Sequence, residues 1–296
     1  MRITEAPIVR ELTTLRLGGK AVALVEVDDE RDFETLPGVL KRLGGRLVSF
    51  GRGSNILAGD GDLDRVLVRP ALAREPQVIT RDAEETVIRA DAGLPLPRLL
   101  AWAAKRGLSG LEGLSGIPGH VGGSAAMNAG SYGVELGDLL RGMRVFTLEK
   151  GLRTLTPGGF VPEYRETVMP GLEKACWHMI WDVDLALRTA EPAAIEAYMA
   201  ENLQKKKAGQ PVTAHSAGCV FRNPEGASAG KMMDEAGLRG KRLGGMAFSS
   251  MHANFLVNEG NGTSAEAMEL IALAEHLVGE RFGVQLRREV IVWLSC

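Results

Sequence analysis

A glycine-rich segment at residues 116–133, GIPGHVGGSAAMNAGSYG, is the first feature of the sequence that could support chemistry. It holds six glycines in eighteen residues. Glycine costs conformational entropy on folding, so a cluster of this density needs a reason. Two reasons are open. The backbone turns repeatedly through positive φ angles, or a bound group presses against the main chain too closely for a Cβ atom.

A second small-residue motif, GRGSNIL at residues 51–57, follows an apolar run typical of a strand. It resembles the dinucleotide-binding fingerprint, but Ile56 stands where that motif has its third glycine. A plain turn and a nucleotide-binding loop are about equally supported by spacing alone. Backbone N–H groups at Gly51 and Gly53, with the side chains of Ser54 and Asn55, would form a good anion cradle.

Three further motifs favour ordinary roles. The segment GASAGKM at residues 226–232 has three residues between its glycines where a phosphate-binding P-loop needs four, and Met232 replaces the magnesium-binding Ser or Thr. The lysines at residues 205–207 end a predicted helix, where a solvated face is expected and a role near an anionic ligand is the alternative. His215 has no second ligand at metal spacing, so no metal site is predicted.

Three chemically capable residues look ordinary in isolation. An arginine such as Arg165, which follows Tyr164, is usually a surface residue. A cysteine such as Cys219, between apolar neighbours, is usually a packed hydrophobe. Glu289 precedes an apolar run and would face solvent at the start of a strand. Residue types and spacing alone therefore indicate a nucleotide-binding protein that could be an enzyme, and nothing more specific.

The elements that position these residues alternate between strands and helices. Apolar runs predict strands at residues 22–27, 46–50, 66–68, 86–90, 143–148, 180–187, 219–221 and 289–293. Helical spacing predicts helices at residues 32–43, 95–106 and 192–207, and a last one from the capping box Thr263 and Glu266 to Gly283. In the 192–207 helix, Ile195, Tyr198, Met199 and Leu203 form one stripe. The fold class is α+β, with a boundary near residues 188–192.

Composition excludes several classes of protein. The chain of 296 residues is 45% hydrophobic and 24% charged, which suits a soluble globular protein with a real core. A net charge of -2 and 5% aromatic residues argue against nucleic-acid binding. Neither a secretory signal nor a membrane-spanning run is present. Three widely spaced cysteines, Cys176, Cys219 and Cys296, form no disulfide framework, so a cytoplasmic location is expected.

Taken in order, seven motifs resemble one family over nearly the whole chain, from about Leu15 to Trp293. They are GRGSNIL, GLSGIPGHVGGSAAMNAGSYG, YR, SAGCVFRNP, AGKMMDEAGLRGKRLGG, HANFLVN and REV. The set is similar to the UDP-N-acetylenolpyruvoylglucosamine reductases of peptidoglycan precursor synthesis. Without a longer insertion after SAGCVFRNP, the chain resembles the shorter form of that family, which leaves the clamping of the uridine end open.

The resemblance implies a flavoenzyme with a two-subdomain FAD-binding fold of the vanillyl-alcohol oxidase (PCMH) type and a C-terminal α+β substrate domain. The expected domains are residues 1–70 and 71–189 for FAD and residues 190–296 for the substrate. FAD is expected to bind non-covalently. NADPH, as co-substrate, reduces the flavin and leaves, and the flavin then passes a hydride to the enolpyruvyl double bond of the UDP-sugar. No membrane, nucleic acid or obligate protein partner is implied.

The resemblance also implies which residues hold the flavin. Backbone N–H groups can satisfy the charge of a diphosphate when no side chain intervenes, which glycine allows. Two segments match the family's flavin-binding motifs: Gly51, Arg52, Gly53, Ser54, Asn55 and Ile56 in the first, and Gly116, Ile117, Pro118, Gly119, Gly122 and Gly123 in the second. Gly130 and Gly133 fit either this role or a simple turn.

Three residues match the family's catalytic positions. Arg165 matches the arginine that polarises the substrate carboxylate, and Glu289 matches the carboxylate that stabilises the enol-like intermediate, directly or through its proton. Cys219 stands where many members have the serine that protonates C2. A thiol with an ordinary pKa near 8.5 is mostly protonated at pH 7, so the replacement is chemically tolerable.

Asn223 matches a residue that contacts the substrate, and Tyr164 and Lys231 are further candidates for substrate binding. Two alternatives remain open at this point. One is another FAD-dependent oxidoreductase of the same fold acting on small alcohols or hydroxy acids. The other is a flavin- or nucleotide-binding regulator without turnover.

Overall fold

The computed structural model describes residues 1–172 and 177–294, so Cys176 and Cys296 lie outside the described residues. The chain forms two compact units, each assembled from segments that are distant in sequence. Unit 1 contains Met1–Glu5, Val22–Arg52 and Arg65–Lys205, and unit 2 contains Ala6–Ala21, Gly53–Asp64 and Lys206–Cys296. The GRGSN loop therefore begins in unit 1 and ends in unit 2.

The first sheet has the strand order β1-β2-β5-β3. Its bounds are β1 Arg2–Glu5, β2 Ala21–Val27, β5 Leu63–Pro70 and β3 Arg46–Ser49. β3 and β5 pair in parallel. The 3-10 helix η1 (Glu30–Glu34) and α2 (Leu36–Leu43) lie in the connection from β2 to β3. Leu36 and Leu40 of α2 are buried in one core with Val25, Val27 and Val66 of the sheet.

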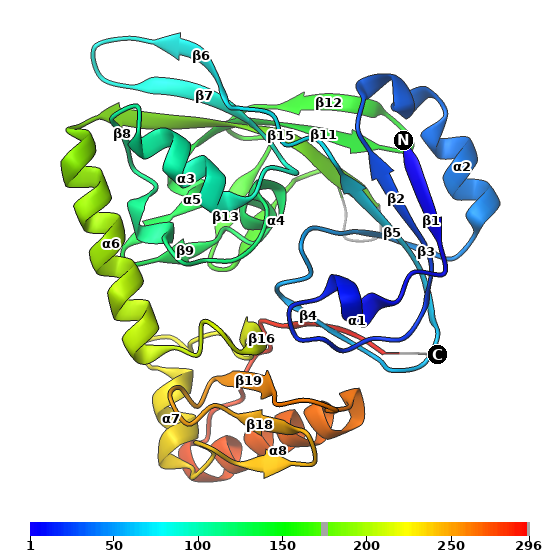
Figure 1. The fold of residues 1–296 in the computed structure, drawn as a ribbon, viewed down its shortest axis with the longest axis vertical. Coiled ribbons are helices and arrows are strands. Elements are labelled where there is room, and N and C mark those ends of the chain that lie inside the picture. Colours follow the sequence, from blue (N-terminus) through cyan, green and yellow to red (C-terminus); the bar gives the residue numbers. More distant parts are fainter. Residues whose placement is uncertain (173–176, 295–296) are drawn as a thin grey trace. The chain divides into compact units, whose positions relative to one another are not determined.

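The second sheet of unit 1 carries the glycine-rich segment. Its main strands run in the order β12-β11-β15-β7-β6, all antiparallel. Their bounds are β12 Gly151–Leu155, β11 Leu140–Thr147, β15 His178–Thr189, β7 Thr86–Asp91 and β6 Gln77–Arg81, and the short β8 (Leu108–Ser109) pairs with β15. The helices α3 (Leu96–Ala104), α4 (Val121–Ala126) and α5 (Leu136–Leu139) lie together beside this sheet (Figure 1). They bury their apolar side chains in one core with the strands.

Buried charges link three strands of this sheet. Asp182 on β15 is 1% exposed, and its carboxylate accepts hydrogen bonds from Arg144 on β11. Arg89 on β7 donates through Nε to Oδ1 of Asp184, at 2.7 Å. A buried carboxylate is tolerated when it is paired and hydrogen-bonded, so these contacts hold β7, β15 and β11 in register.

Unit 2 is built around a smaller antiparallel sheet, in the order β16-β19-β18-β17. The strand bounds are β16 His215–Cys219, β19 Phe255–Asn258, β18 Met246–Phe248 and β17 Arg242–Leu243. The helices α7 (Ala229–Glu235) and α8 (Ser264–Phe282) share its core. The predicted capping box of Thr263 and Glu266 is confirmed, and Gly283 ends α8 with φ +66°.

The N-terminal segment also belongs to this unit. Leu15 and Leu17, which follow the short helix α1 (Val9–Leu12), are buried in the same core, and Asn258 donates to the carbonyl oxygen of Leu15. β4 (Ile56–Ala58) pairs in parallel with the last strand, β20 (Ile291–Trp293). Residues near the start, near position 56 and near the end of the chain therefore build one unit.

The long helix α6 (Pro192–Gly209) buries a different stripe from the predicted one. Ile195 is buried and Met199 packs against the core, as expected, but Tyr198 is 43% exposed. Asn202 and Lys206 are buried instead, at 1% and 4% exposure. The expectation of a solvated face for residues 205–207 is therefore wrong for Lys206, because positions 195, 199, 202 and 206 share one side of a helix.

Two short strands, β9 (Gly130–Ser131) and β10 (Val134–Glu135), form a small hairpin at the end of the glycine-rich segment. A second small hairpin, β13 (Val161–Glu163) and β14 (Glu166–Val168), was not predicted. The predicted strand 219–221 lies earlier, as β16, and only Cys219 of the predicted residues belongs to it. Phe221 instead forms an isolated bridge with Arg288.

Candidate active site

Different structural features explain why glycine occupies the individual positions of the 116–133 segment. Gly116, Gly119 and Gly133 have φ angles of +78°, +133° and +75°, which side chains other than glycine rarely adopt. Gly122 lies against β7's following loop, where an added Cβ would lie 2.7 Å from the Cβ of Ala92. The interpretation of Gly133 as a turn residue is confirmed, and the first of the two open reasons accounts for half of the cluster.

The backbone around Gly122 is fixed by neighbouring main chain. Gly122 N–H donates to the carbonyl oxygen of Ala92 at 2.8 Å, and Val121 N–H donates to that of Leu94 at 2.9 Å. Leu96 N–H donates to the carbonyl oxygen of Gly119 at 3.0 Å. The loop backbone is therefore held by hydrogen bonds to neighbouring main chain, as suits a preorganised binding loop.

Neither a positive φ angle nor a close neighbouring atom explains why glycine stands at Gly51 and Gly123. Neither has a positive φ angle, and a Cβ added at either position would meet no atom of the described residues within 4 Å. Free space beside the backbone is not special to these two glycines, because Gly38 on α2 has it as well. The FAD-binding role of Gly51 and Gly123 therefore stays a prediction.

Positive charge gathers at these loops. His120 immediately precedes α4, and the guanidinium groups of Arg69 and Arg52 act on its ring electrostatically. Burial, and after it the charges of Arg69 and Arg52, lower the pKa of His120 from 6.5 to about 4. Arg69 is paired with Glu26 at 2.6 Å. A neutral histidine between two cations suits a site whose ligand carries the negative charge of a diphosphate.

The depressed pKa of His120 predicts a pH effect on stability. An unfolded histidine binds a proton below about pH 6.5, whereas the folded ring does so only near pH 4, so stability present at neutral pH is lost as the pH falls between these values. Between about pH 7.5 and about pH 5, we expect flavin-free wild type to lose about 2 kcal/mol more than His120→Gln. Urea denaturation of both proteins at both pH values measures this difference in the free energy of unfolding. Equal losses in wild type and His120→Gln contradict the prediction.

The later part of the GRGSN loop lies beside Glu289 within unit 2. The Asn55 side-chain amide donates to the carbonyl oxygen of Glu289 at 3.1 Å. The Ile291 N–H donates to the carbonyl oxygen of Asn55 at 3.0 Å. The parallel pair of β4 and β20 causes this approach, with Ile56 opposite Ile291. A predicted flavin-binding residue and a predicted catalytic residue, far apart in sequence, are thus neighbours.

Cys219 lies on the segment next to Glu289. The Glu289 N–H donates to the carbonyl oxygen of Val220 at 2.7 Å, so the two predicted catalytic residues stand on adjoining backbone segments. The register of β16 against β19 shifts between Ser216 and Cys219, with Gly218 at φ +77°. Such bulges turn a side chain out of the regular alternation and occur often at active sites.

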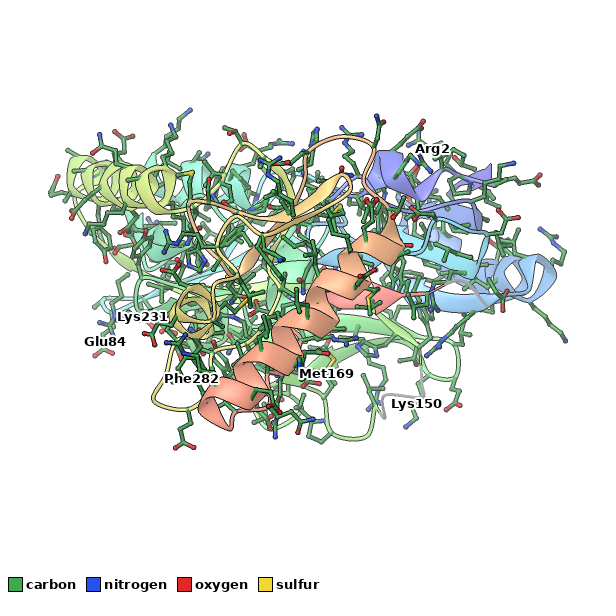
Figure 2. The ribbon with its side chains drawn as sticks, turned by 90° about the horizontal axis from the view of Figure 1, so that it is seen from below. Arg2, Glu84, Lys150, Met169, Lys231 and Phe282 are labelled. Carbon is green, nitrogen blue, oxygen red and sulfur yellow. The ribbon has the colours of Figure 1, made fainter. Side chains whose placement is uncertain are left out.

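Asn223 and Lys231 lie further along the same unit. Asn223 accepts a hydrogen bond from the Ala229 N–H at 3.1 Å and so shapes the loop that leads into α7. Lys231 on α7 lines an open pocket together with Glu235 and with Phe282 at the end of α8 (Figure 2). Their contacts with a substrate stay predictions.

Arg165 is presented by the unpredicted hairpin in unit 1. It is the second residue of the two-residue loop between β13 and β14, and it has φ +62°. Its guanidinium carbon lies 4.9 Å from the centre of the Tyr164 ring. Arg165 belongs to unit 1, whereas Cys219 and Glu289 belong to unit 2, so the meeting of all three around one substrate stays a prediction.

Residues 21–155 match the FAD binding domain, and residues 210–293 match the UDP-N-acetylenolpyruvoylglucosamine reductase C-terminal domain. The UDP-N-acetylenolpyruvoylglucosamine reductase of Nitratidesulfovibrio vulgaris is 50% identical over 99% of this chain and 100% of its own length. The chain belongs to the UDP-N-acetylenolpyruvoylglucosamine reductase family. The reductase of Oleidesulfovibrio alaskensis is 48% identical over 98% of each chain.

A solved structure supports the family fold. The crystal structure of UDP-N-acetylenolpyruvylglucosamine reductase from Thermus caldophilus superposes with a TM-score of 0.81 at 34% identity, covering 99% of both chains. The predicted α+β fold, a PCMH-type FAD-binding fold with a C-terminal reductase domain, is confirmed. The predictions of a flavin-dependent reductase of peptidoglycan precursor synthesis, with FAD as cofactor and NADPH as reductant, are confirmed as well.

Membership of the reductase family decides between the predicted activity and the two alternatives, because the C-terminal match covers the substrate domain. No helix among the described residues has the length and hydropathy of a membrane-spanning segment. No group of His, Cys, Asp and Glu within the described part of the chain is arranged to hold a metal ion.

The sequence analysis missed two buried asparagines that order these reductase segments. Asn254 accepts from the Phe221 N–H at 2.9 Å and donates to the Phe221 carbonyl oxygen at 2.8 Å, which fixes the backbone beside Cys219. Asn128, 1% exposed, donates to the carbonyl oxygen of Glu163 at 2.9 Å, in the segment before Arg165. An asparagine among small or apolar residues is the signal that could have found both, because a buried amide must be hydrogen-bonded.

Proposed function

We propose that this chain reduces UDP-N-acetylenolpyruvoylglucosamine to UDP-N-acetylmuramate with NADPH, in the cytoplasm and without an obligate protein or nucleic-acid partner. The observation that carries the proposal is the approach of Asn55, Cys219 and Glu289 within unit 2, across three segments that are distant in sequence. A flavin-binding loop residue, a proton donor and a carboxylate, carried on adjoining backbone segments, are the residue types that reduction of a polarised double bond requires.

The flavin is proposed to bind non-covalently along the two glycine loops. Gly51 and Gly123 leave open space at the main chain, and Arg52 and His120 lie near one another there. Ser54 and Asn55 supply polar side chains, and Gly116, Ile117, Pro118, Gly119 and Gly122 form the rigid second loop. FAD held by these residues would supply the hydride transfer from NADPH to the substrate.

The protein's own residues then have three roles. Arg165 pairs with the carboxylate of the enolpyruvyl group and stabilises the negative charge that grows there as the hydride arrives. Cys219 gives its thiol proton to C2, so that the double bond gains one hydride and one proton in total. Glu289 stabilises the enol-like species. Asn223, Tyr164 and Lys231 are proposed to contact the UDP-sugar.

The proposed domains are residues 1–70 and 71–189 for the flavin and residues 190–296 for the substrate. This division by role does not follow the two compact units, because Gly53–Asp64 folds with Lys206–Cys296. One motif can therefore serve the flavin while its backbone is held by the substrate domain.

An anaerobic titration tests the proposed reaction. We expect the purified protein to be yellow, to be bleached by NADPH, and to regain its oxidised spectrum on addition of the enolpyruvyl UDP-sugar. Simple alcohols and hydroxy acids serve as the control additions and leave the oxidised flavin unreduced. A colourless protein, or a reduced flavin that the UDP-sugar does not reoxidise, contradicts the proposal.

A further inference from the structure

We propose that Asn128 and Gly130 are positioning residues for Arg165. Asn128 anchors the strand that leads into the arginine's loop, and Gly130 leaves the space in which the guanidinium group lies. This inference rests on the role proposed for Arg165 above. It assigns the second half of the glycine-rich segment to the arginine hairpin, residues 161–168.

Arg165 needs such support because of its backbone. In a two-residue hairpin loop, a positive φ at the second residue is the position that type II turns give to glycine or asparagine. Arg165 adopts φ +62° there. A non-glycine residue persists in this conformation when its surroundings over-determine it, and such residues cluster at functional sites.

Asn128 supplies part of that support, through three hydrogen bonds from one buried amide. Its Nδ2 donates to the carbonyl oxygen of Glu163 at 2.9 Å and to Oε2 of Glu135 at 2.8 Å. Its Oδ1 accepts from the Gly137 N–H at 2.8 Å. Glu163 is the last residue of β13, directly before the loop that holds Arg165. The amide therefore fixes the entry to that loop.

A second hydrogen bond fixes β14, the strand that follows the Arg165 loop. The Thr167 hydroxyl on β14 donates to the carbonyl oxygen of Ala125 at 2.6 Å, and both atoms are buried. Ala125 lies in the last turn of α4, three residues before Asn128. The two strands of the arginine hairpin are thus both bonded to the stretch that follows the flavin loop.

Gly130 contributes to the positioning of Arg165 because it has no side chain. It does not have a positive φ angle, so its backbone does not require glycine. A Cβ added there would lie 3.0 Å from Nη1 of Arg165 and 3.0 Å from Cγ of Glu135. The carbonyl oxygen of Val134 is a third neighbour, at 3.3 Å. Contacts this short require the neighbours to give by a few tenths of an ångström, and the guanidinium is one of them. Gly133, by contrast, has φ +75° and an open surrounding among the described residues.

The chemical consequence follows from geometry. An arginine binds a carboxylate best when its planar fork is correctly oriented, and a small displacement of a positioned group costs much of its effect. Asn128 and Gly130 therefore affect the step in which Arg165 binds the substrate carboxylate. Reduction of the flavin by NADPH, which involves no substrate carboxylate, lies outside its influence.

The holoenzyme variant Gly130→Ala tests this proposal in the two half-reactions separately. We expect stopped-flow reoxidation of the reduced flavin by the UDP-sugar to slow by about tenfold. Bleaching by NADPH should stay within about twofold of wild type. The matched control is Gly38→Ala on α2, where the added methyl group meets no atom of the described residues within 4 Å and both rates should be unchanged. Equal slowing of both half-reactions in Gly130→Ala overturns the proposal.

A double-mutant cycle separates this inference from the role of Arg165 itself. If Gly130 acts through the arginine, Gly130→Ala causes no further slowing in an Arg165→Ala background. Slowing that persists there overturns the positioning role and leaves the proposed function intact. An Arg165→Ala variant with normal reoxidation instead contradicts the role proposed for Arg165.

Asn128→Gly is a second test variant. Asn128 has φ +40°, and glycine can adopt this backbone conformation without strain. It removes the three hydrogen bonds without forcing a new conformation. We expect the same selective loss in reoxidation, again absent in the Arg165→Ala background. Unchanged reoxidation in Asn128→Gly overturns its part in the proposal.

Discussion

Replacing Cys219 by alanine is expected to slow reduction of the UDP-sugar by at least about a hundredfold, while NADPH still bleaches the flavin. A thiol of ordinary pKa is mostly protonated at neutral pH and can give its proton to C2, which a methyl group cannot. The structure supports this role by placing Cys219 after a bulge, on the segment adjoining Glu289. Anaerobic stopped-flow reoxidation of the reduced enzyme by the UDP-sugar measures the effect.

The matched control is Cys219→Ser. The hydroxyl keeps a transferable proton of similar position, so we expect this variant to stay within about tenfold of wild type. It should also resist inactivation by peroxide, to which a thiol at an open site is vulnerable. Normal turnover by Cys219→Ala would place the proton donor elsewhere in the protein.

The second large effect concerns Arg165→Gly, for which we expect activity and stability to change in opposite senses. Loss of the guanidinium should lower the rate of substrate reduction by about 10²–10³-fold, as for other donors that stabilise developing charge. Because Arg165 holds φ +62°, glycine relieves backbone strain, and the free energy of unfolding should equal wild type or exceed it by up to about 1 kcal/mol. Urea denaturation and stopped-flow reoxidation measure the two effects.

Arg165→Lys is the companion variant. It keeps the positive charge and the strained backbone but lacks the planar fork, so we expect intermediate activity and wild-type stability. If Arg165→Gly is less stable than wild type by more than about 1 kcal/mol, the arginine contributes to folding, and strain is not its main energetic consequence.

The longest regular elements, such as α6, α8 and β15, could be predicted from local pattern. The capping box at Thr263 and the glycine stop at Gly283 bound α8 as expected, because both signals act within one turn of the helix. The stripe on α6 was mistaken at Tyr198 because periodicity does not distinguish two adjacent helix faces when polar residues such as Asn202 are the buried ones.

The short hairpin at residues 161–168 illustrates what local pattern could not predict. Its strands have three residues each, and its loop residue Arg165 has a conformation that arginine rarely adopts. Hydrogen bonds from Asn128 and Thr167 to partners 35 and 42 residues away stabilise it. Contacts of that range leave no trace in a window of neighbouring residues.

By itself the sequence determined the family and its FAD-dependent reductase activity, because ordered motifs are properties of the chain alone; the FAD loops and the catalytic residues stay predictions. The tertiary structure decided which glycines serve the backbone, which leave open space, and which makes room for Arg165. It also decided that Asn55, Cys219 and Glu289 are neighbours. The physical reason is that strand pairing and buried hydrogen bonds join segments by shape and polarity, whatever their separation along the chain.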